Sequence, residues 1–292
     1  MRIVTRPDFD GVVCAALLKN IYTTTEPTLW IEPYELQESA HEIKKNDIIA
    51  NLPYVDGCSL WFDHHYSNKI DKPFDGGFEL APSAARIIFN YYTGRFTKDF
   101  TELVEAADDI DSANFTIDQI QHPEKYSYIL LDATISGKKK EDRLYWDMVT
   151  DLLMSKKIDE IMDNNDVKQK SKSAIEQNRM FGDYLKKHST MNGHTVITDF
   201  RSVDKVPRGN RFHIYSLFPQ CYTDMRIRYA AEDREKVIVS LGHNIFYKKS
   251  KVNIGELMSQ YGGGGHFGAG SCNFHVDKAE EYINTIIKKL DN

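Results

Sequence analysis

The stretch Leu60-Trp61-Phe62-Asp63-His64-His65 turns from apolar to polar within one residue. Its apolar half predicts a short buried strand. Its polar half follows where such a strand opens into a loop, which is where α/β proteins bind ligands. Imidazole nitrogen and carboxylate oxygen together suit borderline divalent ions such as manganese, zinc and iron(II). The triplet Asp63-His64-His65 therefore indicates part of a metal site, with a solvated loop or a hydrogen-bonded histidine pair as the alternative interpretation.

Upstream, an acidic pair lies between two predicted elements. Residues Arg2–Thr5 predict a strand and Val12–Tyr22 a helix, so Asp8 and Asp10 fall in the turn between them. Two carboxylates in this spacing can point into one cleft and attract a cation. Capping of the helix by one of these aspartates is the alternative.

Three further segments complete the first half of the chain. Residues Asp47–Pro53 predict a strand that ends at Asn51, and Ala81–Tyr92 and Lys98–Ala107 predict helices. A third acidic group, Asp108-Asp109-Ile110-Asp111-Ser112, is expected just past the second of these helices. This group is either part of the same site or an ordinary acidic loop.

The second half of the chain has a different pattern. Residues Glu141–Lys187 are polar with apolar residues at helical spacing, which predicts a helical connector. We place a boundary near Ser189, which gives domains 1–188 and 189–292. Beyond it, a closing helix is expected at Lys278–Leu290, after β-type runs at His194–Phe200, His213–Leu217, Met225–Tyr229, Lys236–Leu241 and Ser271–Val276.

A run of four glycines lies within this second domain. Gly262, Gly263, Gly264 and Gly265 precede His266. Ordering four glycines costs conformational entropy, and a ligand that closely approaches the backbone would explain them. Their bare amides can surround an anion, and His266 adds a side-chain donor. A flexible hairpin tip is the alternative.

Composition narrows the class of protein. The 292 residues are 41% hydrophobic and carry a net charge of -6, which indicates a globular protein and argues against a general nucleic-acid coat. No apolar run approaches the roughly 20 residues that cross a bilayer, and Met1–Thr5 lacks the apolar region of a signal peptide. Four scattered cysteines fit free thiols in a reducing compartment. We therefore expect a cytoplasmic protein with no membrane partner.

Taken in order, Asp8-Phe9-Asp10-Gly11, Asp63-His64-His65, the Asp108–Ser112 group and Gly262–His266 resemble the DHH phosphoesterase superfamily with its DHH-associated C-terminal domain, of the exopolyphosphatase-related type. The resemblance covers most of the chain. It implies an α/β fold with a parallel-sheet DHH domain, a helical linker and a smaller mixed α/β C-terminal domain. It also implies an active site in the cleft between the two domains.

The resemblance further implies roles for individual residues. Asp8, Asp10, His64 and Asp108 would hold one or two divalent ions, with manganese expected. Asp63 and His65 would orient ligands and contact phosphate. In the second domain, a substrate phosphate would be bound by the four glycine amides and His266, aided by His243 and Asn244.

Two positions depart from the superfamily pattern. Val4 stands where many relatives have a histidine, and Asn51 stands where many have a bridging aspartate. A neutral amide bridges two cations poorly, so the affinity for at least one ion should fall. Asp56, Asp109 or Asp111 could replace the missing carboxylate.

The expected function is a metal-dependent phosphoesterase that hydrolyses a phosphoanhydride or phosphodiester bond. Its substrate would be a small phosphorylated molecule or a short oligonucleotide, from polyphosphate and pyrophosphate to short RNA and cyclic dinucleotides. The alternative is a degenerate member that binds a phosphorylated ligand or a nucleic-acid end without turnover. A homodimer is left open.

Overall fold

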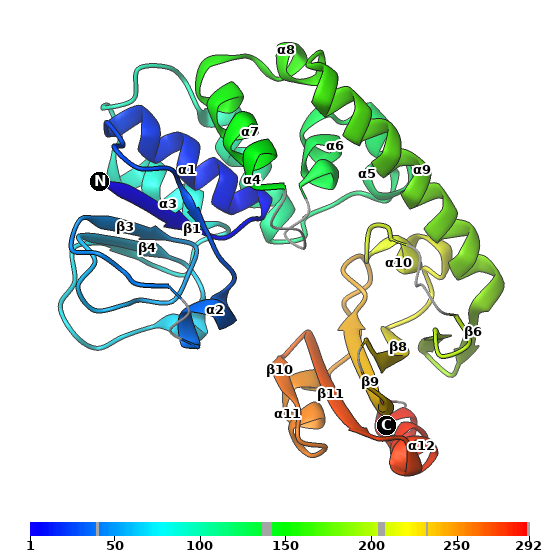
Figure 1. Ribbon diagram of the computed structural model, residues 1–292. Coiled ribbons are helices and arrows are strands. Elements are labelled where there is room, and N and C mark those ends of the chain that lie inside the picture. Colours follow the sequence, from blue (N-terminus) through cyan, green and yellow to red (C-terminus); the bar gives the residue numbers. More distant parts are fainter. Residues whose placement is uncertain (39–40, 136–141, 204–207, 232, 291–292) are drawn as a thin grey trace. The chain divides into compact units, whose positions relative to one another are not determined.

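The computed structural model describes residues 1–38, 41–135, 142–203, 208–231 and 233–290, and Figure 1 shows them as a ribbon. The chain divides into two units that each have their own sheet. The first unit comprises Met1–Phe115 and His122–Ala174, and the second comprises Thr116–Gln121 and Ile175–Asn292.

The first unit contains a five-stranded sheet in which every pair of neighbours is parallel. Its strand order is β2-β1-β3-β4-β5. The strands are β1 (Arg2–Thr5), β2 (Leu29–Trp30), β3 (Asp47–Ala50), β4 (Leu60–Asp63) and β5 (Gly76–Phe78).

Both faces of this sheet are buried, as expected for a parallel sheet. On one face, Ile3 and Phe62 belong to a core that includes most of helix α1 (Phe9–Ile21). On the other face, Val4 and Trp61 belong to a second apolar cluster. Successive strand residues point to opposite faces, so continuous apolar runs such as Ile3-Val4 supply both cores.

Helices cover the first of these faces. Figure 1 shows α1 and α3 beside strands β1, β3 and β4, and α1 packs against α3, α4 and α7. The α-helices of this unit, apart from α1 and the start of α9, are α2 (Pro33–Gln37), α3 (Ala84–Tyr91), α4 (Thr101–Asp111), α6 (Ser127–Thr134), α7 (Arg143–Ser155) and α8 (Ile158–Met162).

The second unit contains a six-stranded mixed sheet of order β10-β11-β9-β8-β7-β6, in which only the β7–β8 pair is parallel. The strands are β6 (Ser189–Asn192), β7 (Thr195–Asp199), β8 (Thr223–Ala230), β9 (Asp233–His243), β10 (Gly264–His266) and β11 (Ala269–His275). Helices α11 (Ile254–Ser259) and α12 (Ala279–Leu290) share one core with this sheet.

A long helix, α9 (Asn165–His188), belongs to both units, since the division falls between Ala174 and Ile175. The second unit also includes the short helix α5 (Ile117–Gln121), which comes much earlier in the chain. The buried Asn178 side chain of α9 donates a hydrogen bond of 3.1 Å to the carbonyl of Ile120 in α5.

Two expected elements differ in the structure. His213–Leu217 is helix α10 and not a strand. Its adjacent residues Ile214 and Tyr215 are both buried, in a small core with Phe181 and Leu185 of α9. A helix turns neighbouring residues toward one curved core, and a short apolar run does not by itself distinguish helix from strand. The acidic group starting at Asp108 was expected past a helix, but Asp108 and Asp111 lie in the last turn of α4.

All four cysteines are free thiols. No helix among the described residues is both long enough and apolar enough to cross a membrane.

Candidate metal and phosphate site

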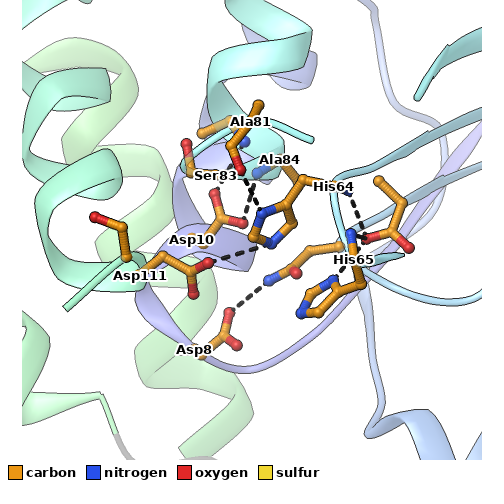
Figure 2. A network of polar contacts seen from close by, with 12 residues as sticks. Asp8, Asp10, His64, His65, Ala81, Ser83, Ala84 and Asp111 are labelled. Atoms are coloured by element: carbon orange, nitrogen blue, oxygen red, sulfur yellow. Dashed lines mark hydrogen bonds and ion pairs between the residues drawn. The ribbon is translucent and has the colours of Figure 1, made fainter. Parts of the chain in front are cut away.

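The site of the first unit lies at the carboxyl ends of three neighbouring strands. Asp8 follows β1, Asn51 follows β3 and His64 follows β4, and these strands are adjacent in the order β1-β3-β4. Parallel strands end at the same edge of a sheet, so the sheet topology brings the three side chains together. Figure 2 shows Asp8 and His64 with Asp10 from α1 and Asp111 from α4.

Asp10 is buried at the amino end of helix α3. Its two carboxylate oxygens accept hydrogen bonds of 2.9 Å from the backbone amides of Ala84 and Ala85. These amides are the donors that a helix leaves unpaired in its first turn, and they favour a negative charge there. Burial, together with the charges of Asp111 and Asp8, nevertheless raises the pKa of Asp10 well above its usual range. The carboxylate therefore stands in a place where a nearby cation would stabilise it.

His64 is oriented by a backbone carbonyl. Its Nδ1 lies 3.0 Å from the carbonyl oxygen of Ala81, which can only accept, so Nδ1 carries the proton. Its Nε2 lies 3.2 Å from Oδ2 of Asp111 but is buried and makes no hydrogen bond among the described residues. Two acceptors at this distance require a positive charge between them, either a proton or a metal ion.

The first residue of the triplet, Asp63, holds the other two in place. Asp63 is fully buried, and its Oδ1 accepts from the backbone amide of His64 at 2.9 Å and from Nδ1 of His65 at 2.8 Å. Its Oδ2 accepts from the Asn68 amide at 2.6 Å. The hydrogen bond that His65 donates to Asp63 raises the pKa of His65, which favours the protonated ring. His65 can therefore hold a proton while Asp63 fixes its orientation.

Asp8 is already surrounded by donors. Its Oδ1 accepts from the backbone amide of Gly11 at 2.9 Å, which caps α1, and from Nδ2 of Asn51 at 3.0 Å. Its Oδ2 forms an ion pair of 3.2 Å with Nε of Arg6. Both of the expected roles of Asp8, helix cap and member of the acidic site, are compatible with this position.

The donor set fits a divalent ion. Ligand atoms of Asp10, His64 and Asp111 lie within 4.8 Å of one another, as do those of Asp63, His64 and His65. Only the first group has a buried imidazole nitrogen without a hydrogen bond facing two carboxylates, because Asp63 is used to orient its neighbours. One neutral imidazole and two carboxylates are a donor set for zinc, iron, manganese and similar ions.

Asp108 lies apart from both of these groups. Its Oδ1 accepts from the Ser83 hydroxyl at 2.6 Å and its Oδ2 forms a pair with Arg86 at 2.5 Å. Of the three proposed replacements, Asp111 faces His64, Asp56 pairs with Lys72 at the surface, and Asp109 accepts from Asn114 in the turn after α4. Val4 is buried in the apolar cluster under the sheet.

Arg6 and the Ala81 carbonyl are site groups that sequence reasoning missed. The signal for Arg6 was present, since it stands two residues before Asp8 at the end of a strand. The Ala81 carbonyl had no sequence signal, because any residue supplies one.

In the second unit, the glycine run forms part of a β-hairpin. Gly264–His266 is strand β10, the edge strand of the sheet, and it pairs with β11 through a turn at Phe267-Gly268. Gly262 and Gly265 have positive φ angles of 75° and 152°. At Gly263, a β-carbon would lie 2.1 Å from the carbonyl oxygen of Ser271, whereas at Gly264 it would meet nothing within 4 Å. The His266 side chain is exposed.

His243 and Asn244 have different environments at the end of β9. His243 contacts the Phe267 ring edge-on at 5.4 Å, its buried Nε2 has no hydrogen-bond partner among the described residues, and burial lowers its pKa. Asn244 is fully buried, donates to the carbonyl of Cys221 at 2.9 Å and accepts from the amide of Phe246 at 2.9 Å. The Asn244 side chain thus shapes a turn.

Known structures place the chain in a family. No protein-family model and no curated protein matches it. PggH of Vibrio cholerae, a pGpG-specific phosphodiesterase, is 33% identical, with a TM-score of 0.85 over 99% of this chain and 98% of that one. A DHH domain described as a member of a family of ribosomal proteins has a TM-score of 0.66 at 11% identity, covering 100% of this chain and 86% of that one. The chain belongs to the DHH phosphoesterase superfamily.

A third DHH-type structure, RecJ of Thermus thermophilus in complex with Mn²⁺, has a TM-score of 0.56 at 11% identity and covers 99% of this chain and 51% of that one. At such identities the likeness shows the shared fold alone. The expected superfamily, the α/β fold class with its parallel and mixed sheets, and the phosphohydrolase class of enzyme are confirmed.

Proposed function

We propose that this DHH phosphoesterase is a metal-dependent phosphodiesterase that cleaves short linear oligonucleotides, with pGpG as the first substrate to test. The observation that carries the proposal is the close approach of two acceptors, Nε2 of His64 and Oδ2 of Asp111 at 3.2 Å, beside the buried Asp10. The 33% identity to a pGpG-specific phosphodiesterase over nearly the whole chain supports the substrate class.

Asp10, His64 and Asp111 would hold the divalent ion. When bound, such an ion neutralises phosphate oxygens and lowers the pKa of a coordinated water so that hydroxide is available near neutral pH. The protein prepares the place for it: the α3 amides fix Asp10, the Ala81 carbonyl fixes the tautomer of His64, and Asp111 faces the open nitrogen. Manganese, zinc or iron would serve, and the donor set does not select among them.

His65 would supply the proton that the leaving oxygen needs. Its Nδ1 is engaged by Asp63, so its Nε2 is the atom available to donate a proton or to bind a phosphate oxygen. The pKa of His65 is raised by Asp63, which favours the protonated ring that a general acid needs. Asp63 itself touches His65 and not the substrate, so its role is to position.

The second unit would bind another phosphate of the substrate. In the described part of the chain, the edge strand β10 pairs with β11 alone, so some of its backbone groups lie outside the sheet. The amides of Gly262 and Gly263, which precede it, already donate to the carbonyls of Ser259 and Met258 in α11. The exposed His266 can add a charge-assisted hydrogen bond. Nε2 of His243, which has no hydrogen-bond partner among the described residues, is a further donor or acceptor at the end of β9. This is phosphate recognition without reading of the base.

The test is a substrate panel on metal-stripped protein. With Mn²⁺ restored, we expect hydrolysis of pGpG and other short RNAs, none with His64→Ala, and full activity with His122→Ala, which changes an exposed histidine of the same unit. Polyphosphate, pyrophosphate and cyclic dinucleotides serve as competing substrates. If pGpG bound tightly but was not hydrolysed at any metal concentration, the protein would be a phosphodinucleotide-binding protein and not an enzyme. If only polyphosphate were hydrolysed, the proposed oligonucleotide substrate would be wrong.

A further inference from the structure

The Asp8 carboxylate differs from the other carboxylates of the site because the protein itself already neutralises it. One oxygen accepts two hydrogen bonds, from Gly11 at 2.9 Å and Asn51 at 3.0 Å, and the other lies 3.2 Å from Nε of Arg6. Asp10 and Asp111, in contrast, have no ion pair with an arginine or lysine among the described residues. The chain therefore supplies a paired cation at Asp8, whereas Asp10 accepts from the α3 amides and Asp111 faces the nitrogen of His64.

Arg6 is also held in this position by Glu32. The same Nε lies 3.2 Å from Oε2 of Glu32, at the start of α2. The backbone amide of Glu32 in turn donates to Glu35 at 2.8 Å, which anchors this residue in a capping box. A guanidinium fixed through Nε by a hydrogen bond to Glu32 and an ion pair with Asp8 keeps the direction of its planar fork.

The outer part of the Arg6 guanidinium is not used by the protein. Neither terminal nitrogen makes a hydrogen bond within the described part of the chain, and the side chain is 37% exposed. These nitrogens have the geometry that binds phosphate oxygens in pairs. An arginine with its inner nitrogen anchored and its outer nitrogens open is arranged to meet an anion.

Asn51, like Arg6, opposes the binding of a cation at Asp8. It is buried in a left-handed conformation with φ of 55°, and its amide group points Nδ2 at Asp8. A cation on this oxygen of Asp8 would have to displace an N–H donor. It would also lie close to a fixed guanidinium, and like charges at such separations repel strongly where water is scarce.

We propose that this centre takes one divalent ion, at Asp10, His64 and Asp111, and that Arg6, anchored on Asp8, is the second positive charge and binds a non-bridging oxygen of the substrate phosphate. The substrate named in this inference rests on the proposed function, whereas the number of bound ions does not. The departure at Asn51 then has a physical meaning: an amide there orients Asp8 toward an arginine and leaves no carboxylate to bridge two ions.

The ion count is tested on the intact wild-type protein. Metal-stripped chain is titrated with Mn²⁺ by calorimetry, and the loaded protein is studied by electron paramagnetic resonance. We expect one tight ion per chain and the spectrum of an isolated Mn²⁺. Two tight ions, or the spectrum of a spin-coupled pair, would overturn the proposal. The double variant Arg6→Gln, Asn51→Asp restores a carboxylate and removes the guanidinium, so it should bind a second ion. A count that stays at one in a folded double variant would also count against it.

The phosphate contact is tested separately by affinity. With Mn²⁺ present, the affinity for a hydrolysis-resistant phosphorothioate analogue of pGpG should fall about ten- to a hundredfold in Arg6→Gln, which is the effect of losing a charge-assisted hydrogen bond. Arg6→Lys should recover part of the loss, and Arg95→Gln, a change at an exposed arginine over the Tyr92 ring, should have no effect. Unchanged affinity in Arg6→Gln would refute the contact. If the wild type did not hydrolyse pGpG, the proposed enzymatic function would be wrong. The ion count and the affinity for the analogue would still decide the role of Arg6.

Discussion

Asp111 and Asp108 lie three residues apart on α4, yet their carboxylates have different partners. Burial raises the pKa of Asp111, which faces the histidine nitrogen, whereas Asp108 is held by Arg86 and Ser83. We expect Asp111→Asn to weaken Mn²⁺ binding at least tenfold and to leave the melting temperature of the metal-free protein unchanged or higher, because a poorly solvated charge is removed. Calorimetric titration and thermal melting measure the two effects.

The matched change is Asp108→Asn. It leaves the Arg86 guanidinium without its carboxylate partner, so we expect a loss of roughly 1 to 3 kcal/mol in the free energy of unfolding. Its Mn²⁺ affinity should equal that of the wild type. If Asp108→Asn lost the metal and Asp111→Asn kept it, the ligand would be Asp108, as the superfamily resemblance implies.

The two histidines of the triplet should separate metal binding from proton transfer. His64→Ala removes the open Nε2, so Mn²⁺ should no longer bind tightly. His65→Ala removes a ring whose Nδ1 is bonded to Asp63, so Mn²⁺ should still bind while turnover of pGpG falls by a factor of about 100 or more. Metal content by atomic emission, measured with kcat, checks both. Equal loss of metal in the two variants would show that His65 is also a ligand.

Much of this site could be predicted from residue types, and the rest depended on side-chain direction. Asp10 and His64 stand at strand and helix boundaries where the sequence pattern changes, so their meeting follows from the parallel topology. The choice between Asp108 and Asp111 turns on about 60° of rotation around a helix axis, a difference that spacing alone does not resolve. Asn244 was expected to meet the substrate, but a Gly-His-Asn sequence after a strand is equally suited to a turn, and its amide is used there.

In the glycine hairpin, one glycine has space for a side chain and another has none. A side chain at Gly264 has free space, so Gly264→Val should fold with a melting temperature near that of the wild type, and a valine suits a strand. Its bulk would cover the amides of the edge strand and should lower the affinity for the pGpG analogue. His266→Ala should act in the same direction, by about tenfold or more. Neither change should alter Mn²⁺ binding, since the ion would be held in the first unit.

Gly263→Val is the control for this hairpin. Its β-carbon would lie 2.1 Å from a backbone oxygen of β11, so the variant should lose stability before any effect on ligand can be measured. A Gly264→Val protein that binds the analogue as well as the wild type would exclude β10 from phosphate recognition.

Elements with a strong period were predicted better than short ones. The strands at Arg2–Thr5 and Leu60–Asp63 and the closing helix have the expected positions within a few residues. Helix α10 was predicted as a strand because five residues give less than two helical turns and therefore no clear period. Its true form depends on Phe181 and Leu185, which are about 30 residues away in the sequence and pack against it.

For the whole molecule, we expect the stability of the metal-free protein to fall as the pH rises. Burial raises the folded-state pKa of Asp10 and Asp111, so the folded state binds more protons than the unfolded state from about pH 4 up to those raised values. The raised pKa of His65 acts in the same sense above about pH 6.5, where its stabilising charge is lost. Melting from pH 5 to 8 in a chelating buffer should show a falling transition temperature, and Asp10→Asn should flatten the slope.

Added Mn²⁺ should reverse this trend. Protons and the ion compete for the same carboxylates, so the rise in melting temperature caused by Mn²⁺ should be larger at pH 8 than at pH 5. An equal rise at both pH values would mean that Asp10 and Asp111 do not ligate the ion.

The second unit is not continuous along the chain, and this has a consequence for how the protein is made. Helix α5, with Ile120, is synthesised well before Asn178, the residue that binds it. A ribosome extends a chain at about 5 to 20 residues per second, so several seconds pass between the synthesis of α5 and that of Asn178. The first unit can fold once the start of α9 has emerged. During that interval, α5 lies in the nascent chain without its partner Asn178. Slower translation between the two would lengthen the exposure of α5.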